Sequence, residues 1–67
     1  AMFICLQTGE AKLYIRESSV YALRTYGNTI EIHYGPGRDS VAVSRKNNEE
    51  ELKRLESFFG IREDSSE

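Results

Sequence analysis

Cys5 and His33 are the residues of this sequence whose side chains could carry nucleophilic or metal chemistry. A cysteine–histidine pair needs hydrogen-bonding reach, a third group that orients the imidazole, and a site for the oxyanion. Glu31 could orient His33, because residues two apart on a strand share a face. The chain holds one cysteine and one histidine, so it offers no cysteine cage and no histidine triad for a metal.

A chain of 67 residues rarely encloses a pocket that excludes water from a reaction. We therefore expect no enzymatic activity, no catalytic residue, no bound metal or cofactor and no small-molecule substrate. Cys5 is expected to pack as a small hydrophobic side chain. The single cysteine excludes an internal disulfide and fits a reducing, cytoplasmic setting.

The segment GPGRDS, residues 35–40, invites comparison with a phosphate-binding loop. Such a loop needs a lysine and a hydroxyl residue that open a helix, whereas here no lysine follows and the next segment has the pattern of a strand. Pro36 and Gly37 are typical of the two central positions of a type II turn, where Gly37 would take a positive φ. We expect a plain turn with Arg38 exposed at its tip, where it could contact a partner.

Five short segments show the composition and alternation of β-strands. They are residues 3–7, 11–16, 20–26, 29–34 and 40–44. Gly9 and the pair Gly27–Asn28 predict tight turns between neighbouring strands. Strict alternation in the third segment would place Tyr21 and Leu23 on one face and Val20 on the other.

The segment after Asn48 changes to the period of an α-helix. The apolar stripe consists of Leu52, Leu55 and Phe59. Asn48 is a predicted N-cap, with Glu51 in a capping-box position, and Gly60 is a predicted C′ residue. Glu50 and Arg54 have the spacing of an i,i+4 ion pair. These patterns predict an α+β fold: an antiparallel β-meander of about five short strands, as a sheet or partial barrel, with one C-terminal helix.

The domain is expected to span residues 1–61, followed by a mobile acidic tail at residues 62–67. Ala1 before Met2 indicates a cloning remnant. The hydrophobic content of 39% is too high for a disordered chain. No apolar run approaches the roughly 18–20 residues of a membrane span, and no signal-peptide pattern opens the chain. We expect a cytoplasmic protein without membrane contact.

The first strand is apolar on both sides, and a single helix can cover only one face of a sheet. Ile4 and Leu6 would face the helix, while Phe3 and Cys5 would point away from it. Either the meander curls into a partial barrel or a second copy covers the open face. Closed two-fold oligomers are common, so we expect a homo-oligomer, with a dimer favoured.

Cations and aromatic residues interleave along the outward positions of the middle strands, with Glu31 among them. Tyrosine and arginine are enriched at protein interfaces, so we interpret the chain as a small non-enzymatic interaction or regulatory module that self-associates and binds a protein partner. The alternative is a regulator that stacks nucleic-acid bases on this face, which the net charge of −2 and Glu31 disfavour. The expected contact residues are Phe3, Tyr14, Arg16, Arg24, Tyr26, His33 and Arg38.

The order of these features resembles the small FlbD-like family of flagellar and swarming-motility proteins. The corresponding stretches are FICLQTGE, LYI, VYAL, NTIEIHYG and NNEEELKRL, which span about residues 2–56. The chain departs from the family pattern in GPGRDS, which is longer and more basic, and in VSRKN, which replaces an acidic helix entry. That family carries no catalytic motif, so the resemblance implies a small accessory or regulatory protein of bacterial or phage type.

Overall fold

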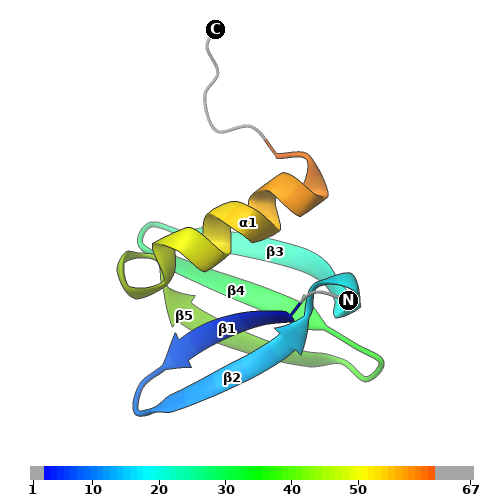
Figure 1. Ribbon diagram of the computed structural model, residues 1–67, viewed down its shortest axis with the longest axis horizontal. Helices are drawn as coiled ribbons and strands as arrows, with labels where there is room; N and C mark the ends of the chain where they lie inside the picture. Colours follow the sequence, from blue (N-terminus) through cyan, green and yellow to red (C-terminus); the bar gives the residue numbers. More distant parts are fainter. Residues whose placement is uncertain (1–2, 62–67) are drawn as a thin grey trace, which may run out of the picture.

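The computed structural model describes residues 3–61, and its elements follow the order expected from the sequence (Figure 1). Within this range the chain forms an α+β fold of five antiparallel strands, two 3-10 turns and one C-terminal helix. The elements are β1 (Phe3–Thr8), β2 (Ala11–Arg16), η1 (Glu17–Ser19), β3 (Val20–Tyr26), β4 (Thr29–Tyr34), β5 (Asp39–Ser44), η2 (Lys46–Asn48) and α1 (Glu49–Phe59). The tail expected at residues 62–67 lies outside the described residues. Between residues 3 and 61, no helix has the length and apolar composition needed to cross a membrane.

The strands form two antiparallel sheets rather than one continuous meander. One sheet is the hairpin β1–β2, and the other has the order β3-β4-β5. Strand β1 lies beside β5, but the Asn48 side chain stands between them: it donates to the carbonyls of Gln7 (3.3 Å) and Ser44 (2.9 Å) and accepts from the Gln7 N–H (2.7 Å). The two sheets therefore curve around one core without closing into a barrel.

The core is built from the inward positions of both sheets and the helix. Its buried apolar residues are Ile4, Leu6, Ile15, Val20, Ile30, Ile32, Val43, Leu52 and Leu55. The helix stripe is thus confirmed at its first two positions, whereas Phe59 is 36% exposed and does not belong to the core. Full burial of a leucine side chain contributes about 1.5–3 kcal/mol, so Leu52 and Leu55 are the main anchors of α1 on the sheets.

Strand β3 contains a bulge that shifts its alternation. Val20 pairs with Tyr34 and Ala22 with His33, so Tyr21 is an extra residue in the ladder. Val20 is consequently buried while Tyr21 is exposed. The expectation of strict alternation in this strand was wrong, because a one-residue insertion moves every preceding side chain to the opposite face.

The turns show where positive φ is used. Gly9 (φ 66°) and Gly27 (φ 54°) take positive φ in the turns from β1 to β2 and from β3 to β4, as expected, whereas Asn28, which was expected to share the positive φ of its turn, does not. Gly37 lies outside the positive-φ region, and the Gly35–Pro36 peptide bond is cis. The segment between β4 and β5 is therefore a turn with exposed Arg38, but the expected type II geometry was wrong.

The helix ends as expected and begins differently. Gly60 (φ 77°) donates its N–H to the Ser57 carbonyl at 3.0 Å, and the Ile61 N–H reaches the Glu56 carbonyl at 2.9 Å, which is a Schellman motif. Asn48 makes no side-chain cap bond. Its amide binds β1 and β5, so the predicted capping box was wrong: the side-chain groups it requires are used in tertiary contacts.

Candidate interaction surface

One side of the β1–β2 hairpin points away from the core. The register pairs Phe3 with Arg16, Cys5 with Tyr14 and Gln7 with Lys12, and directly opposed residues of an antiparallel pair share a face. Their neighbours along β1, Ile4 and Leu6, are fully buried on the other side. We call this outward surface the hairpin face; its residues are Phe3, Cys5, Gln7, Lys12, Tyr14 and Arg16.

The hairpin face exposes aromatic surface next to a cation. Tyr14 is 62% exposed and Phe3 is 49% exposed. The Arg16 guanidinium lies over the Phe3 ring, 5.1 Å from its centroid, in a cation–π arrangement. Cys5 is a half-buried free thiol opposite Tyr14, and it raises the pKa of the Tyr14 phenol, chiefly through a hydrogen bond between the two side chains. An amphipathic patch of this type is suited to contact with protein.

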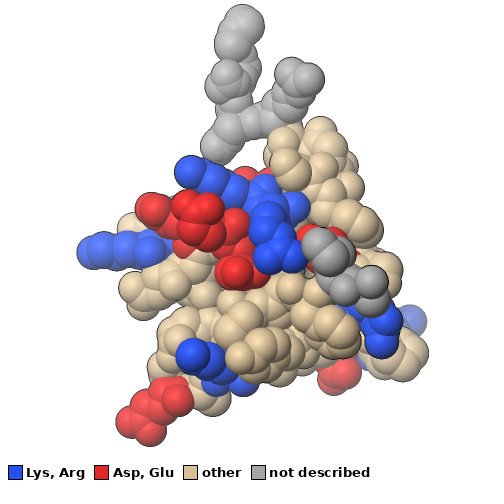
Figure 2. All heavy atoms as spheres, viewed as in Figure 1, with Lys and Arg blue, Asp and Glu red and all other residues tan. Residues whose placement is uncertain are grey.

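A groove of about 370 Å³ runs between the hairpin face and the beginning of α1. Lys12 and Lys46 line it together with Glu49 and Glu50, so positive and negative side chains stand on the same surface. The lining is completed by Cys5, Gln7, Asn47, Asn48 and Glu51. Figure 2 shows charged side chains of both signs gathered over α1, while mostly uncharged side chains cover the strands below it.

A second cluster, which we call the sheet network, lies on the outer face of β3 and β4. Glu31 Oε1 is 3.1 Å from His33 Nε2 and 3.6 Å from Arg24 Nε, and it accepts a hydrogen bond of 3.1 Å from the Tyr26 hydroxyl. Arg24 also donates to that hydroxyl at 3.0 Å, and the Tyr21 ring lies 6.2 Å from the His33 ring. The hydrogen bond with His33, followed by that from Tyr26, lowers the pKa of Glu31.

The seven expected contact residues do not share one face, because the strands belong to two sheets. Three lie on the hairpin face, three belong to the sheet network, and Arg38 stands alone in the β4–β5 turn. The sequence interpretation missed two residues. Tyr21 points outward only because of the bulge, and the Glu17 carboxylate lies 3.5 Å from the guanidinium of Arg54 in α1. No local pattern marks either residue.

The two side chains with nucleophilic or metal chemistry are placed apart. Cys5 lies on the hairpin face opposite Tyr14, whereas His33 lies in the other sheet and contacts Glu31 and Tyr21. Across residues 3–61, no group of three or more His, Cys, Asp and Glu side chains converges in a way that could hold a metal ion.

Comparisons of the chain with protein-family models, with curated proteins and with solved structures found no match. The resemblance to the FlbD-like family therefore stays an expectation from the sequence.

Proposed function

We propose that the protein is a small non-enzymatic interaction module that forms a dimer through the hairpin face. The observation that carries the proposal is the exposure of Phe3 and Tyr14 on adjacent strands. The other side of the same two strands is completely or almost completely buried, at Ile4, Leu6 and Ile15. Exposed aromatic residues beside an arginine have the composition of protein interfaces.

A second copy of the chain is the partner that fits this surface best. A two-fold interface brings the same patch of both subunits together, so the patch has to complement itself. The groove beside the hairpin face meets this requirement, since Lys12 and Lys46 stand next to Glu49 and Glu50. Each basic side chain of one copy can therefore approach an acidic side chain of the other.

The exposed area sets the strength of the dimer. Covering two half-exposed aromatic side chains on each of two copies contributes about 3–6 kcal/mol. A dissociation constant of about 1 µM requires about 8 kcal/mol. The aromatic residues alone are thus insufficient for a tight dimer, and the groove contacts decide whether association occurs in the micromolar range or above it. A weak dimer also leaves the hairpin face available to a protein partner, with which the second copy competes.

The sheet network supports the nucleic-acid alternative less well. Arg24, its main cation, is engaged by Glu31 and Tyr26, and the Glu31 carboxylate would repel a phosphate. A titration of single-stranded oligonucleotides across a salt series distinguishes the two functions. Binding whose log affinity falls with log salt by roughly 0.7 per phosphate contacted would favour nucleic acid; absence of binding at low salt leaves protein partners.

The compartment follows from the chemistry proposed for the surface. The free Cys5 thiol lies on the hairpin face, where oxidation would alter the contact. A reducing compartment keeps that thiol intact, and we place the module in the cytoplasm.

Light scattering and sedimentation velocity on a dilution series test the dimer. The variant Phe3→Ser/Tyr14→Ser should lose concentration-dependent association, whereas Phe58→Ser should retain it. Phe58 is a matched control because it is 53% exposed and lies on α1, away from the hairpin face. Equal association of both variants, or a parent protein that stays monomeric up to millimolar concentration, would remove the basis of the proposal.

A further inference from the structure

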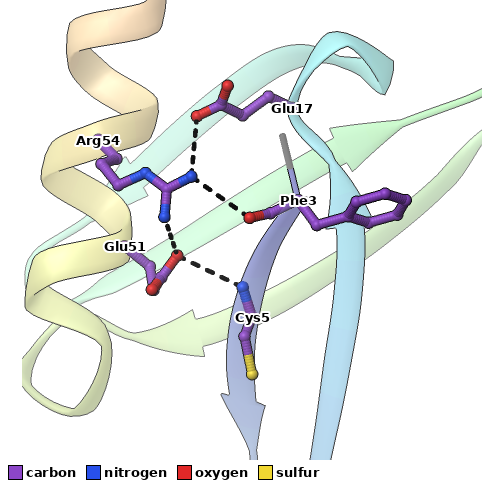
Figure 3. A network of polar contacts seen from close by, with 5 residues as sticks. All are labelled: Phe3, Cys5, Glu17, Glu51 and Arg54. Atoms are coloured by element: carbon purple, nitrogen blue, oxygen red, sulfur yellow. Dashed lines mark hydrogen bonds and ion pairs between the residues drawn. The ribbon is translucent and has the colours of Figure 1, made fainter. Parts of the chain in front are cut away.

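The outer edge of strand β1 is covered by side chains of the helix. Strand β2 pairs with one edge of β1. On the other edge, the Cys5 N–H donates to Glu51 Oε1 at 3.4 Å, and the Phe3 carbonyl accepts from Arg54 Nη2 at 3.3 Å (Figure 3). These two backbone groups would otherwise be a free donor and a free acceptor of the kind that a further strand uses.

The cover continues along the strand. Asn48 binds both the N–H and the carbonyl of Gln7. Phe3, Cys5 and Gln7 alternate along β1 and so present their backbone groups to the same edge. The helix residues that meet them are spaced by three, at positions 48, 51 and 54, and therefore lie along one side of η2 and α1. Side chains from one segment thus replace a neighbouring strand.

Strand β1 is the strand that most needs such a cover. Its sequence FICLQT carries no charged residue, whereas each of the other strands described between residues 3 and 61 carries at least one. Charged side chains are a common protection of strand edges against pairing with other chains. An uncharged segment with apolar residues on both faces is prone to pair with a copy of itself.

The cover is open to solvent at its outer end. Arg54 holds it there, 3.3 Å from Glu51 and 3.5 Å from Glu17, with 43% of its side chain exposed. Beyond Leu55 the helix contributes Phe58 and Phe59, which are exposed, so few apolar contacts hold its last turn against the sheets. The side chains of Glu51 and Arg54 are long and partly exposed, so they can move away from β1 while Leu52 and Leu55 stay buried.

We propose that the outer edge of β1 is a second self-association site, which pairs antiparallel with β1 of another copy and which Glu51 and Arg54 keep closed. With a two-fold axis at Ile4, the Cys5 N–H of one copy faces the Phe3 carbonyl of the other and the reverse. The groups that the helix covers are thus the donor and acceptor of a self-complementary pair. This site uses the backbone edge, and it is distinct from the hairpin face.

The test uses the double variant Glu51→Ala/Arg54→Ala in a Tyr14→Ser background, which removes the main aromatic contact of the hairpin face without changing β1. Alanine is the best helix former, so α1 persists. Glu10→Ala/Lys53→Ala in the same background is the matched control, because it removes the same two charge types from exposed positions that neither line the groove nor contact the outer edge of β1. Amide hydrogen exchange by NMR and light scattering are measured on a dilution series.

At low concentration, the Cys5 amide of Glu51→Ala/Arg54→Ala should exchange roughly fivefold faster than in the control. At high concentration, the particle mass should rise and the Cys5 amide should regain protection, which links the association to this edge. The proposal is overturned if the folded variant matches the control in mass at every concentration, or if it associates while the Cys5 amide stays unprotected. Should the double variant not fold, Arg54→Ala alone carries the same two readouts.

Discussion

Glu31 is the acidic residue of the sheet network and contacts three of its side chains. It accepts from Tyr26 and lies within ion-pair distance of His33 and Arg24. Because these contacts favour the carboxylate, they lower the pKa of Glu31 below its ordinary value of 4.5. A carboxyl group whose pKa falls on folding stabilises the fold above the unfolded pKa, and this contribution disappears as the pH falls through the folded pKa.

The variant Glu31→Gln should therefore lose part of the acid sensitivity of the parent. Between about pH 5 and about pH 3 the midpoint temperature of the parent should fall further than that of Glu31→Gln, because the variant has no carboxylate to protonate. Thermal melts followed by circular dichroism measure the difference. Glu10→Gln, at an exposed position in the β1–β2 turn, is the control and should follow the parent. An identical fall in Glu31→Gln and the parent would contradict the assignment.

Two turn glycines differ in what they contribute to stability. Gly27 has a φ of 54°, a conformation that costs an alanine about 1–2 kcal/mol. Gly37 lies outside the positive-φ region, and a Cβ there would meet only Asp39 Oδ2, at an ordinary 3.6 Å. Urea denaturation should show Gly27→Ala destabilised by about 1–2 kcal/mol, with Gly37→Ala within about 0.5 kcal/mol of the parent. A reversed order would show that the two turns have been assigned wrongly.

At the scale of elements, the contact between η2 and β1 depends on Asn48. This buried amide joins β1 to the end of β5 by three hydrogen bonds. Asn48→Ala should lower the free energy of unfolding by about 2–4 kcal/mol, because it leaves backbone groups of Gln7 without partners. Asn47→Ala is the control: Asn47 is exposed, and the change should cost no more than about 0.5 kcal/mol. A small loss in both variants would mean that water replaces the Asn48 amide.

The elements were predictable where the pattern is local. Alternation in β1, β2, β4 and β5 and the stripe of Leu52 and Leu55 depend on burial of neighbouring positions, and the structure confirms them. The face of Tyr21 was not predictable, because a bulge leaves no mark in the alternation itself. The cap assigned to Asn48 failed for a different reason: the same side chain suits a cap or a tertiary contact, and only the neighbouring strand decides between them.

Arg54 also makes a tertiary contact in place of the local contact that its spacing predicted. Its spacing predicted a pair with Glu50, whereas the guanidinium lies against Glu51 and Glu17 and donates to the Phe3 carbonyl. The expected pair was wrong, because an exposed i,i+4 pair stabilises a helix by only about 0.2–0.5 kcal/mol. A contact that also satisfies a strand edge outweighs that amount.

At the scale of the whole molecule, the division into two sheets separates the proposed contact surfaces. The hairpin face and the sheet network lie on different sheets, so the proposed dimer through the hairpin face would leave the sheet network uncovered. The sequence could not predict this division, because it depends on the long-range placement of Asn48 between β1 and β5. The surface predicted as one Tyr/Arg face is in fact two smaller ones.

The central claim is a dimer through the hairpin face. It is tested most directly by identifying the residues whose amide NMR signals shift as the protein concentration rises. Backbone amide NMR spectra of the parent protein are recorded from low micromolar to submillimolar concentration. The account predicts shifts that grow with concentration at Phe3, Cys5, Tyr14 and Arg16 and along the groove at residues 46–51, with little change around Phe58. Spectra that do not depend on concentration, or shifts gathered at the end of α1, would contradict it.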